Sequence, residues 1–74
     1  MIVQTITVGD YKANLLQLKC GIHTGYQYRI YTNLNGKRTC VARNYSYMWD
    51  KDACYKNMVD DLNVTMCIAK DLFH

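Results

Sequence analysis

Cysteine and histidine are the residue types in this chain that could hold a metal ion or act as a nucleophile. The chain has cysteines at positions 20, 40, 54 and 67 and histidines at positions 23 and 74. No CxxC, CxH or HxxxH pair brings two ligands onto one turn of chain, as zinc sites generally do. We therefore predict no metal site and no bound cofactor. We expect the cysteines to be reduced and to pack as small apolar side chains.

An enzyme that reacts through a thiolate needs a base beside the cysteine. Cys20 and His23 are close in sequence, but at the end of a strand we do not expect them to face each other, and no acid orients the histidine. The chain has no Gly-rich phosphate loop and no GxSxG elbow. Asp60 and Asp61 are adjacent and diverge by about 100° on a helix. We predict that the protein is not an enzyme.

Composition is that of a small globular domain. The 74 residues are 50% hydrophobic, enough for a core in one α+β domain spanning 1–74. The net charge of +3 is mild for a nucleic-acid module, and most basic residues lie between Lys12 and Arg43. No segment reads as a signal peptide or a transmembrane span, so we expect a cytoplasmic protein with no membrane partner.

The strongest local signal is a β-hairpin centred on Asn35-Gly36, because both residues tolerate the positive φ of a two-residue type I′ turn. The flanking segments alternate aromatic or β-branched residues with polar ones. This turn predicts the pairs Leu34 with Lys37, Tyr31 with Cys40, Ile30 with Val41, Tyr28 with Arg43 and Tyr26 with Tyr45. We expect the face with Ile30 to be buried and the face with Arg29 to be exposed.

The segments before the hairpin complete a sheet. Residues 2–8 predict a strand whose inward face carries Ile2, Gln4, Ile6 and Val8. Residues 11–22 fit either a short helix capped by Asp10 or a strand, and their strict alternation favours the strand. The expected architecture is α+β: an antiparallel β-meander of three to four strands with one main helix packed on one face.

Helix signals begin at Asp50, a good N-cap residue. Tyr55, Met58, Val59 and Leu62 form the expected apolar stripe, with Cys54 on its margin. Residues 64–72 fit either more helix or a last edge strand. We expect a kinked or second helix there, because one straight helix from 50 to 72, about 35 Å long, is more than a small sheet can cover.

The run YRIYTNLNGKRTCVARNYSY, followed by WDKDACYKNM, resembles the strand–Asn-Gly–strand–helix unit of the YegP-like small bacterial domains. The resemblance covers residues 26–58, and the matching positions are Arg29, Asn35, Gly36, Tyr45 and Ala53, the last slightly later than in the pattern. Such domains have no settled activity, so the resemblance implies an architecture and no catalytic residue. In size, tyrosine content and lack of proline the chain also resembles small phage-encoded accessory proteins.

Tyrosine, tryptophan and arginine are enriched at protein interfaces. The segment before the helix holds more rings than a small core needs, and we expect Trp49 to close the core. This ring-rich segment and the Arg29 face together predict an interaction surface made of Arg29, Tyr31, Arg38, Tyr45, Tyr47 and Trp49.

From this surface we predict a non-catalytic module, an adaptor or inhibitor, that binds another protein or a second copy of itself. The alternative is a single-stranded nucleic-acid-binding module that uses cations and rings on the same sheet face.

Overall fold

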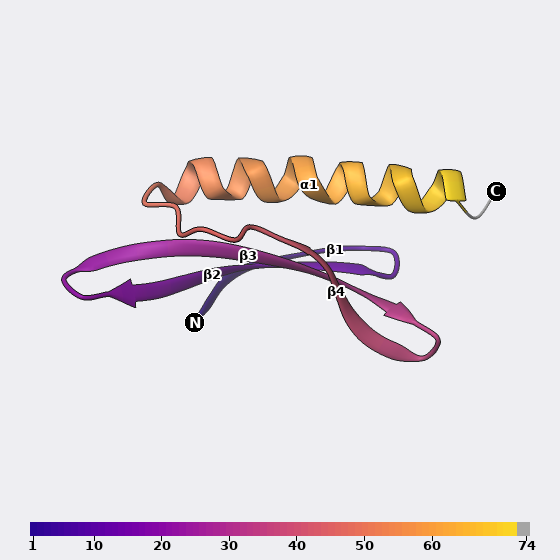
Figure 1. The fold of residues 1–74 in the computed structure, drawn as a ribbon, viewed down its shortest axis with the longest axis horizontal. Helices are drawn as coiled ribbons and strands as arrows, with labels where there is room; N and C mark the ends of the chain where they lie inside the picture. Colours follow the sequence, from indigo (N-terminus) through magenta and orange to yellow (C-terminus); the bar gives the residue numbers. More distant parts are fainter. Residues whose placement is uncertain (73–74) are drawn as a thin grey trace.

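The computed structural model describes residues 1–72 and contains four strands and one helix: β1 (Ile2–Val8), β2 (Tyr11–Cys20), β3 (His23–Leu34), β4 (Lys37–Arg43) and α1 (Lys51–Leu72). The strands pair antiparallel in the order β1-β2-β3-β4. The helix lies lengthwise over one face of the sheet and packs on β3, β2 and β4 (Figure 1). The predicted fold class, an α+β meander with a helix on one face, is confirmed.

Residues 11–22 form a strand and turn and not the alternative short helix. Ala13 and Leu15 are fully buried toward α1, whereas Leu16 and Leu18, whose alternation with polar residues favoured a strand, lie on the other face and are half-buried. Asp10 lies with Gly9 in the turn between β1 and β2 and caps no helix. This strand is the inner neighbour of β3 and supplies Ala13 and Leu15 to the buried core.

A single continuous helix runs from Lys51 to Leu72, so the predicted kink or second helix over 64–72 is wrong, as is the edge-strand alternative. At 1.5 Å per residue α1 is about 33 Å long. The expected limit came from underestimating the sheet: β3 has 12 residues and extends about 40 Å at 3.3 Å per residue. A sheet of that length can lie under the whole helix (Figure 1).

The core lies between α1 and the covered face of the sheet. Its fully or almost fully buried apolar residues are Ala13, Leu15, Tyr28, Ile30, Cys54, Met58 and Leu62. Cys54, Met58 and Leu62 recur every fourth residue and form the centre of the helix stripe. Cys54 is therefore central and not marginal as predicted, while Tyr55 and Val59 are only half-buried.

A β-bulge in β4 changes the predicted register of the central hairpin. The pairs nearest the turn are as predicted, from Leu34 with Lys37 to Tyr31 with Cys40. The register then shifts by one residue, so Ile30 pairs with Ala42 and Arg29 pairs with Arg43. The predicted pairs Ile30 with Val41 and Tyr28 with Arg43 are wrong, because the extra residue of a bulge moves every later side chain to the other face.

A second register shift lies between Ile2 and Gln4 in β1. Ile2 is 54% exposed and Val8 is 40% exposed, whereas Val3 packs against the core together with Ile6. The prediction that Ile2 faces inward is therefore wrong, and the bulge accounts for the exchange of Ile2 and Val3. Gln4 and Val8 pair with Leu15 and Tyr11 and so lie on the covered side as predicted, but both are exposed on this edge strand.

The segment that connects β4 to α1 continues the edge of β3 where β4 diverges from it. Met48 exchanges two backbone hydrogen bonds with Tyr26, at 2.7 and 2.9 Å, in place of the predicted pairing of Tyr26 with Tyr45. The Asn44 Oδ1 atom accepts a hydrogen bond from the Tyr28 backbone N–H at 2.8 Å. Met48 packs against the core and Trp49 is 62% exposed, so the prediction that Trp49 closes the core is wrong.

Candidate binding face on the open side of the sheet

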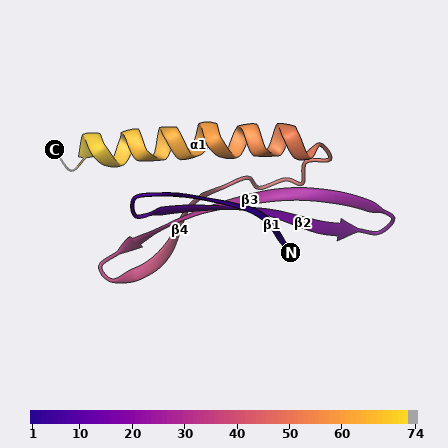
Figure 2. The same ribbon diagram turned by 180° about the vertical axis from the view of Figure 1, so that it is seen from behind.

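The open face is the side of the sheet that turns away from α1 (Figure 2). Tyr28 and Ile30 are buried toward the helix, so their neighbours Arg29 and Tyr31 point the other way. Three further cations share this side through their cross-strand partners. Lys12 pairs with Tyr31, Arg43 with Arg29, and Arg38 with Asn33.

Two cross-strand rows define the centre of the open face. The first row runs Thr7, Lys12, Tyr31, Cys40, and the second runs Thr5, Asn14, Arg29, Arg43. Neither row contains a carboxylate. The aspartates of the C-terminal third lie in or just before α1, on the other side of the sheet. The sheet face is therefore basic and the helix more acidic.

Arg29 and Arg43 are a like-charged pair directly across two strands. Such a pair destabilises a sheet by a few tenths of a kcal/mol up to about 1 kcal/mol, because nothing between the two side chains neutralises them. Both side chains are exposed, so solvent and salt reduce this repulsion. An anion bound between the two guanidinium groups removes it altogether.

On this side of the sheet, an arginine guanidinium group lies over each of two tyrosine rings. The Arg38 guanidinium carbon lies 4.5 Å from the centre of the Tyr31 ring, and the Arg43 guanidinium carbon lies 5.1 Å from the centre of the Tyr45 ring. These cation–π contacts hold flexible arginines at fixed positions. Tyr31 is half-buried, whereas Tyr45 is 84% exposed.

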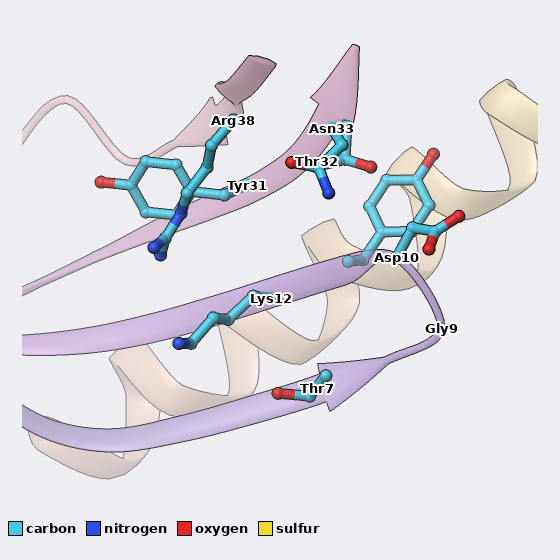
Figure 3. Close-up of a pocket in the computed structure, with 9 residues that line it drawn as sticks. Thr7, Gly9, Asp10, Lys12, Tyr31, Thr32, Asn33 and Arg38 are labelled. Carbon is cyan, nitrogen blue, oxygen red and sulfur yellow. The ribbon is translucent and has the colours of Figure 1, made fainter. Parts of the chain in front are cut away.

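One hollow on this side has a volume of about 250 Å³ and lies between the β1–β2 turn and the β3–β4 hairpin. Figure 3 shows Arg38 lying over the Tyr31 ring, Lys12 on the neighbouring strand β2, and the Asp10 carboxylate at the opposite end. A second hollow of about 160 Å³ is lined by Gln27, Arg29, Arg43, Asn44 and Tyr45. Both hollows are shallow and polar, which suits an extended ligand rather than an enclosed small molecule.

The predicted interaction surface divides into two parts. Arg29, Tyr31 and Arg38 lie together on the open face, and Tyr45 joins them through Arg43. Trp49 lies elsewhere: its ring meets the His23 ring edge-on at 5.6 Å. His23 begins β3, eight residues before Tyr31, which is about 26 Å along the strand.

Tyr47 is 48% exposed and lines none of the hollows described above.

Lys12 and Arg43 are the two members of this face that sequence reasoning did not assign to the surface. The signal for Lys12 was misleading, because Lys12 shares its face of the strand with the apolar Leu16 and Leu18, which the alternation would place in the core. Arg43 carried no usable signal, because its face depends on the bulge at Val41.

The cysteines lie in different environments. Cys54 is buried in the core, as predicted, and burial raises the pKa of its thiol. Cys40 and Cys67 are exposed, so the prediction that they pack as small apolar side chains is wrong. Within residues 1–72, no group of three or more potential ligands lies close enough together to hold a metal ion.

The strands β2 and β3 pair the backbones of Cys20 and His23 across the Gly21–Ile22 turn. The side chain of Cys20 and the whole of His74 lie outside the described part of the structure, so the prediction that Cys20 and His23 do not face each other stays a prediction.

Comparison with protein-family models, with curated proteins and with solved structures finds no match to this chain. The resemblance of residues 26–58 to the YegP-like unit stays a prediction. Within residues 1–72, no helix combines the length and the apolar character needed to cross a membrane.

Proposed function

We propose that this chain is a non-catalytic interaction module that binds an anionic partner through the open face of its sheet. One observation carries the proposal: the bulge in β4 sets Arg43 opposite Arg29, on the same face as Lys12 and Arg38. Proteins that keep a repulsive pair on an exposed surface usually do so for a binding function, since the pair contributes nothing to folding. An acidic protein surface and a nucleic acid both supply the required charge.

The shape of the site also supports binding rather than catalysis. The hollows are open and shallow, and they hold cations, tyrosines and amides. A surface of this kind gains affinity and association rate from charge complementarity, and its binding weakens as salt screens the charges.

Retention on immobilised heparin, a generic polyanion, tests the proposal. The double variant Arg29→Gln/Arg43→Gln removes two charges from the open face. The matched control, Lys51→Gln/Lys56→Gln, removes two charges from exposed positions of α1 and gives the same net charge. We expect the arginine variant to elute at clearly lower salt than the wild type and the lysine variant to elute close to it. Equal shifts for both variants would show that net charge alone, and no particular face, controls binding.

A further inference from the structure

Two neighbouring hollows on the open side share four kinds of side chain, and the larger hollow also contains the Asp10 carboxylate at one end. Each has a tyrosine, an arginine lying over that ring, a second cation and a side-chain amide. In the larger hollow these are Tyr31, Arg38, Lys12 and Asn33. In the smaller hollow they are Tyr45, Arg43, Arg29 and Gln27. Because the set occurs twice, it matches a ligand that repeats rather than a single small molecule.

The spacing of the two sets follows from the sheet. The larger hollow takes Tyr31 and Asn33 from β3 and the smaller takes Gln27 and Arg29, so their centres are four residues, about 13 Å, apart along the strand. This spacing is about twice the separation of successive phosphates in an extended single strand. The two cations in each hollow can neutralise one phosphate.

The rings and amides discriminate between anionic partners. An acidic peptide offers carboxylates, which need cations but no aromatic surface. A nucleotide offers a phosphate, a flat base and a hydrogen-bonding edge, and proteins bind unpaired bases by stacking on tyrosine or arginine and by hydrogen bonds from amides. In a duplex the flat faces of the bases are stacked on one another, so the tyrosine and arginine side chains cannot stack on them.

We infer that the partner is a single-stranded nucleic acid, of which two nucleotides separated by one intervening nucleotide occupy the Tyr31/Arg38 and Tyr45/Arg43 hollows. This inference rests on the proposed function of the open face. Tyr45 is the better stacking platform, because it is 84% exposed. Arg38 covers the half-buried Tyr31 ring, so the base there stacks on the guanidinium group.

Fluorescence anisotropy with labelled oligo(dT) and oligo(U) of about twelve nucleotides tests the inference at about 50 mM salt. Polyaspartate of similar length serves as the polyanion without bases, and a mixed-sequence duplex as the polyanion with hidden bases. The informative variant is Tyr45→Ala. Its controls are Tyr45→Phe, which keeps the ring, and Tyr47→Ala, which removes an exposed ring that lines neither hollow.

We expect Tyr45→Ala to weaken oligonucleotide binding about tenfold, in line with the loss of one stacked base. Tyr45→Phe and Tyr47→Ala should bind as the wild type does. Polyaspartate should bind more weakly than either oligonucleotide. Its affinity should be the same for the wild type and for all three variants. The comparison of oligo(dT) with oligo(U) then distinguishes DNA from RNA.

Two results overturn the inference in different ways. If polyaspartate binds as tightly as the oligonucleotides, or the duplex as tightly as the single strands, or if Tyr45→Ala changes nothing, the face binds anions without reading bases, and the proposed function stands alone. If no polyanion binds at low salt, both the inference and the proposed function are wrong. Circular dichroism of each variant confirms that the fold is intact in either case.

Discussion

At the scale of single residues, one hydrogen bond ties the covered face of the sheet to the helix. The Tyr28 hydroxyl donates to Asp61 Oδ2 at 2.7 Å, across the core between β3 and α1. Tyr28 is nearly fully buried and Asp61 is half-buried. This contact fixes the side of β3 that faces the helix, and so it indirectly fixes Arg29 and Tyr31 on the other side.

Tyr28→Phe removes the hydroxyl and keeps the ring. We expect the free energy of unfolding near neutral pH to fall by about 1–2 kcal/mol, because the carboxylate loses its partner in a partly dry environment. Urea denaturation measures this change. Tyr55→Phe is the control. Tyr55 is half-buried on α1, the helix that carries Asp61, and within residues 1–72 its hydroxyl makes no side-chain hydrogen bond that the substitution would remove.

The same residue gives stability a dependence on alkaline pH. Burial, and then the hydrogen bond to Asp61, raise the pKa of Tyr28 above its ordinary value of 10.0. The unfolded chain therefore loses this proton first, so the stabilisation is complete below pH 10.0 and declines as the pH rises above it.

We expect the wild type to lose about 1.4 kcal/mol per pH unit above that point from this group alone. Tyr28→Phe lacks this loss, so the stability difference between the two proteins should shrink as the pH rises. A difference that stays constant up to about pH 11 would contradict the assigned cause.

Thiol reactivity provides a test of the core. Cys54 is buried with a raised pKa, whereas Cys40 and Cys67 are exposed. We expect iodoacetamide to modify Cys54 at least about tenfold more slowly than Cys40, since the thiolate is the reacting form and the core excludes the reagent. Mass spectrometry of the digested protein measures each site, and unfolding in urea should abolish the difference. Equal rates in the folded protein would mean that α1 does not cover the sheet as described.

At the scale of elements, the Asn35-Gly36 turn sets the register of the central hairpin. Asn35 has φ of 54° and Gly36 has φ of 79°, as the predicted type I′ turn requires. A side chain at position 36 would have room, because a Cβ added to Gly36 would meet nothing within 4 Å.

Gly36→Ala should therefore destabilise the protein by about 1 kcal/mol through backbone strain alone. Thermal denaturation checks this expectation against Asn35→Gly, which relaxes the neighbouring position and should change stability little. A loss of several kcal/mol in Gly36→Ala would indicate a contact at the turn that the structure lacks.

The elements were largely predictable from the sequence because their signals are local. Alternation identified β2, and Asp50 was correctly predicted as the helix cap: its Oδ1 accepts the Asp52 backbone N–H at 3.0 Å. The two bulges were not predictable, since a bulge appears only when two strands are aligned, and nothing in the sequence around Val3 or Val41 marks it. The Val41 bulge is also the feature that completes the open face.

At the scale of the whole molecule, the length of the sheet decides how the helix lies. A shorter sheet would have required a break in α1, and the prediction failed because strand lengths were underestimated. The predicted role of Trp49 failed for a related reason. Met48 bridges to the edge of β3 and packs against the core, which leaves the next residue outside.

The cations of the open face also predict how strongly the binding constant depends on salt concentration. Each phosphate contact with a single strand contributes about −0.7 to the slope of log K against log salt concentration. The cations Lys12, Arg29, Arg38 and Arg43 therefore predict a slope of about −3 for the wild type with oligo(dT). Removing two of the arginines should reduce it to about −1.5.

The most direct test of the account is this slope, measured by anisotropy from about 50 to 200 mM salt for three proteins: wild type, Arg29→Gln/Arg43→Gln, and Lys51→Gln/Lys56→Gln. If the open face is the binding site, the slope should halve in the arginine variant and stay unchanged in the lysine variant. The same slope in all three proteins, or a slope that falls equally in both variants, would contradict the claim that the open face is the binding site.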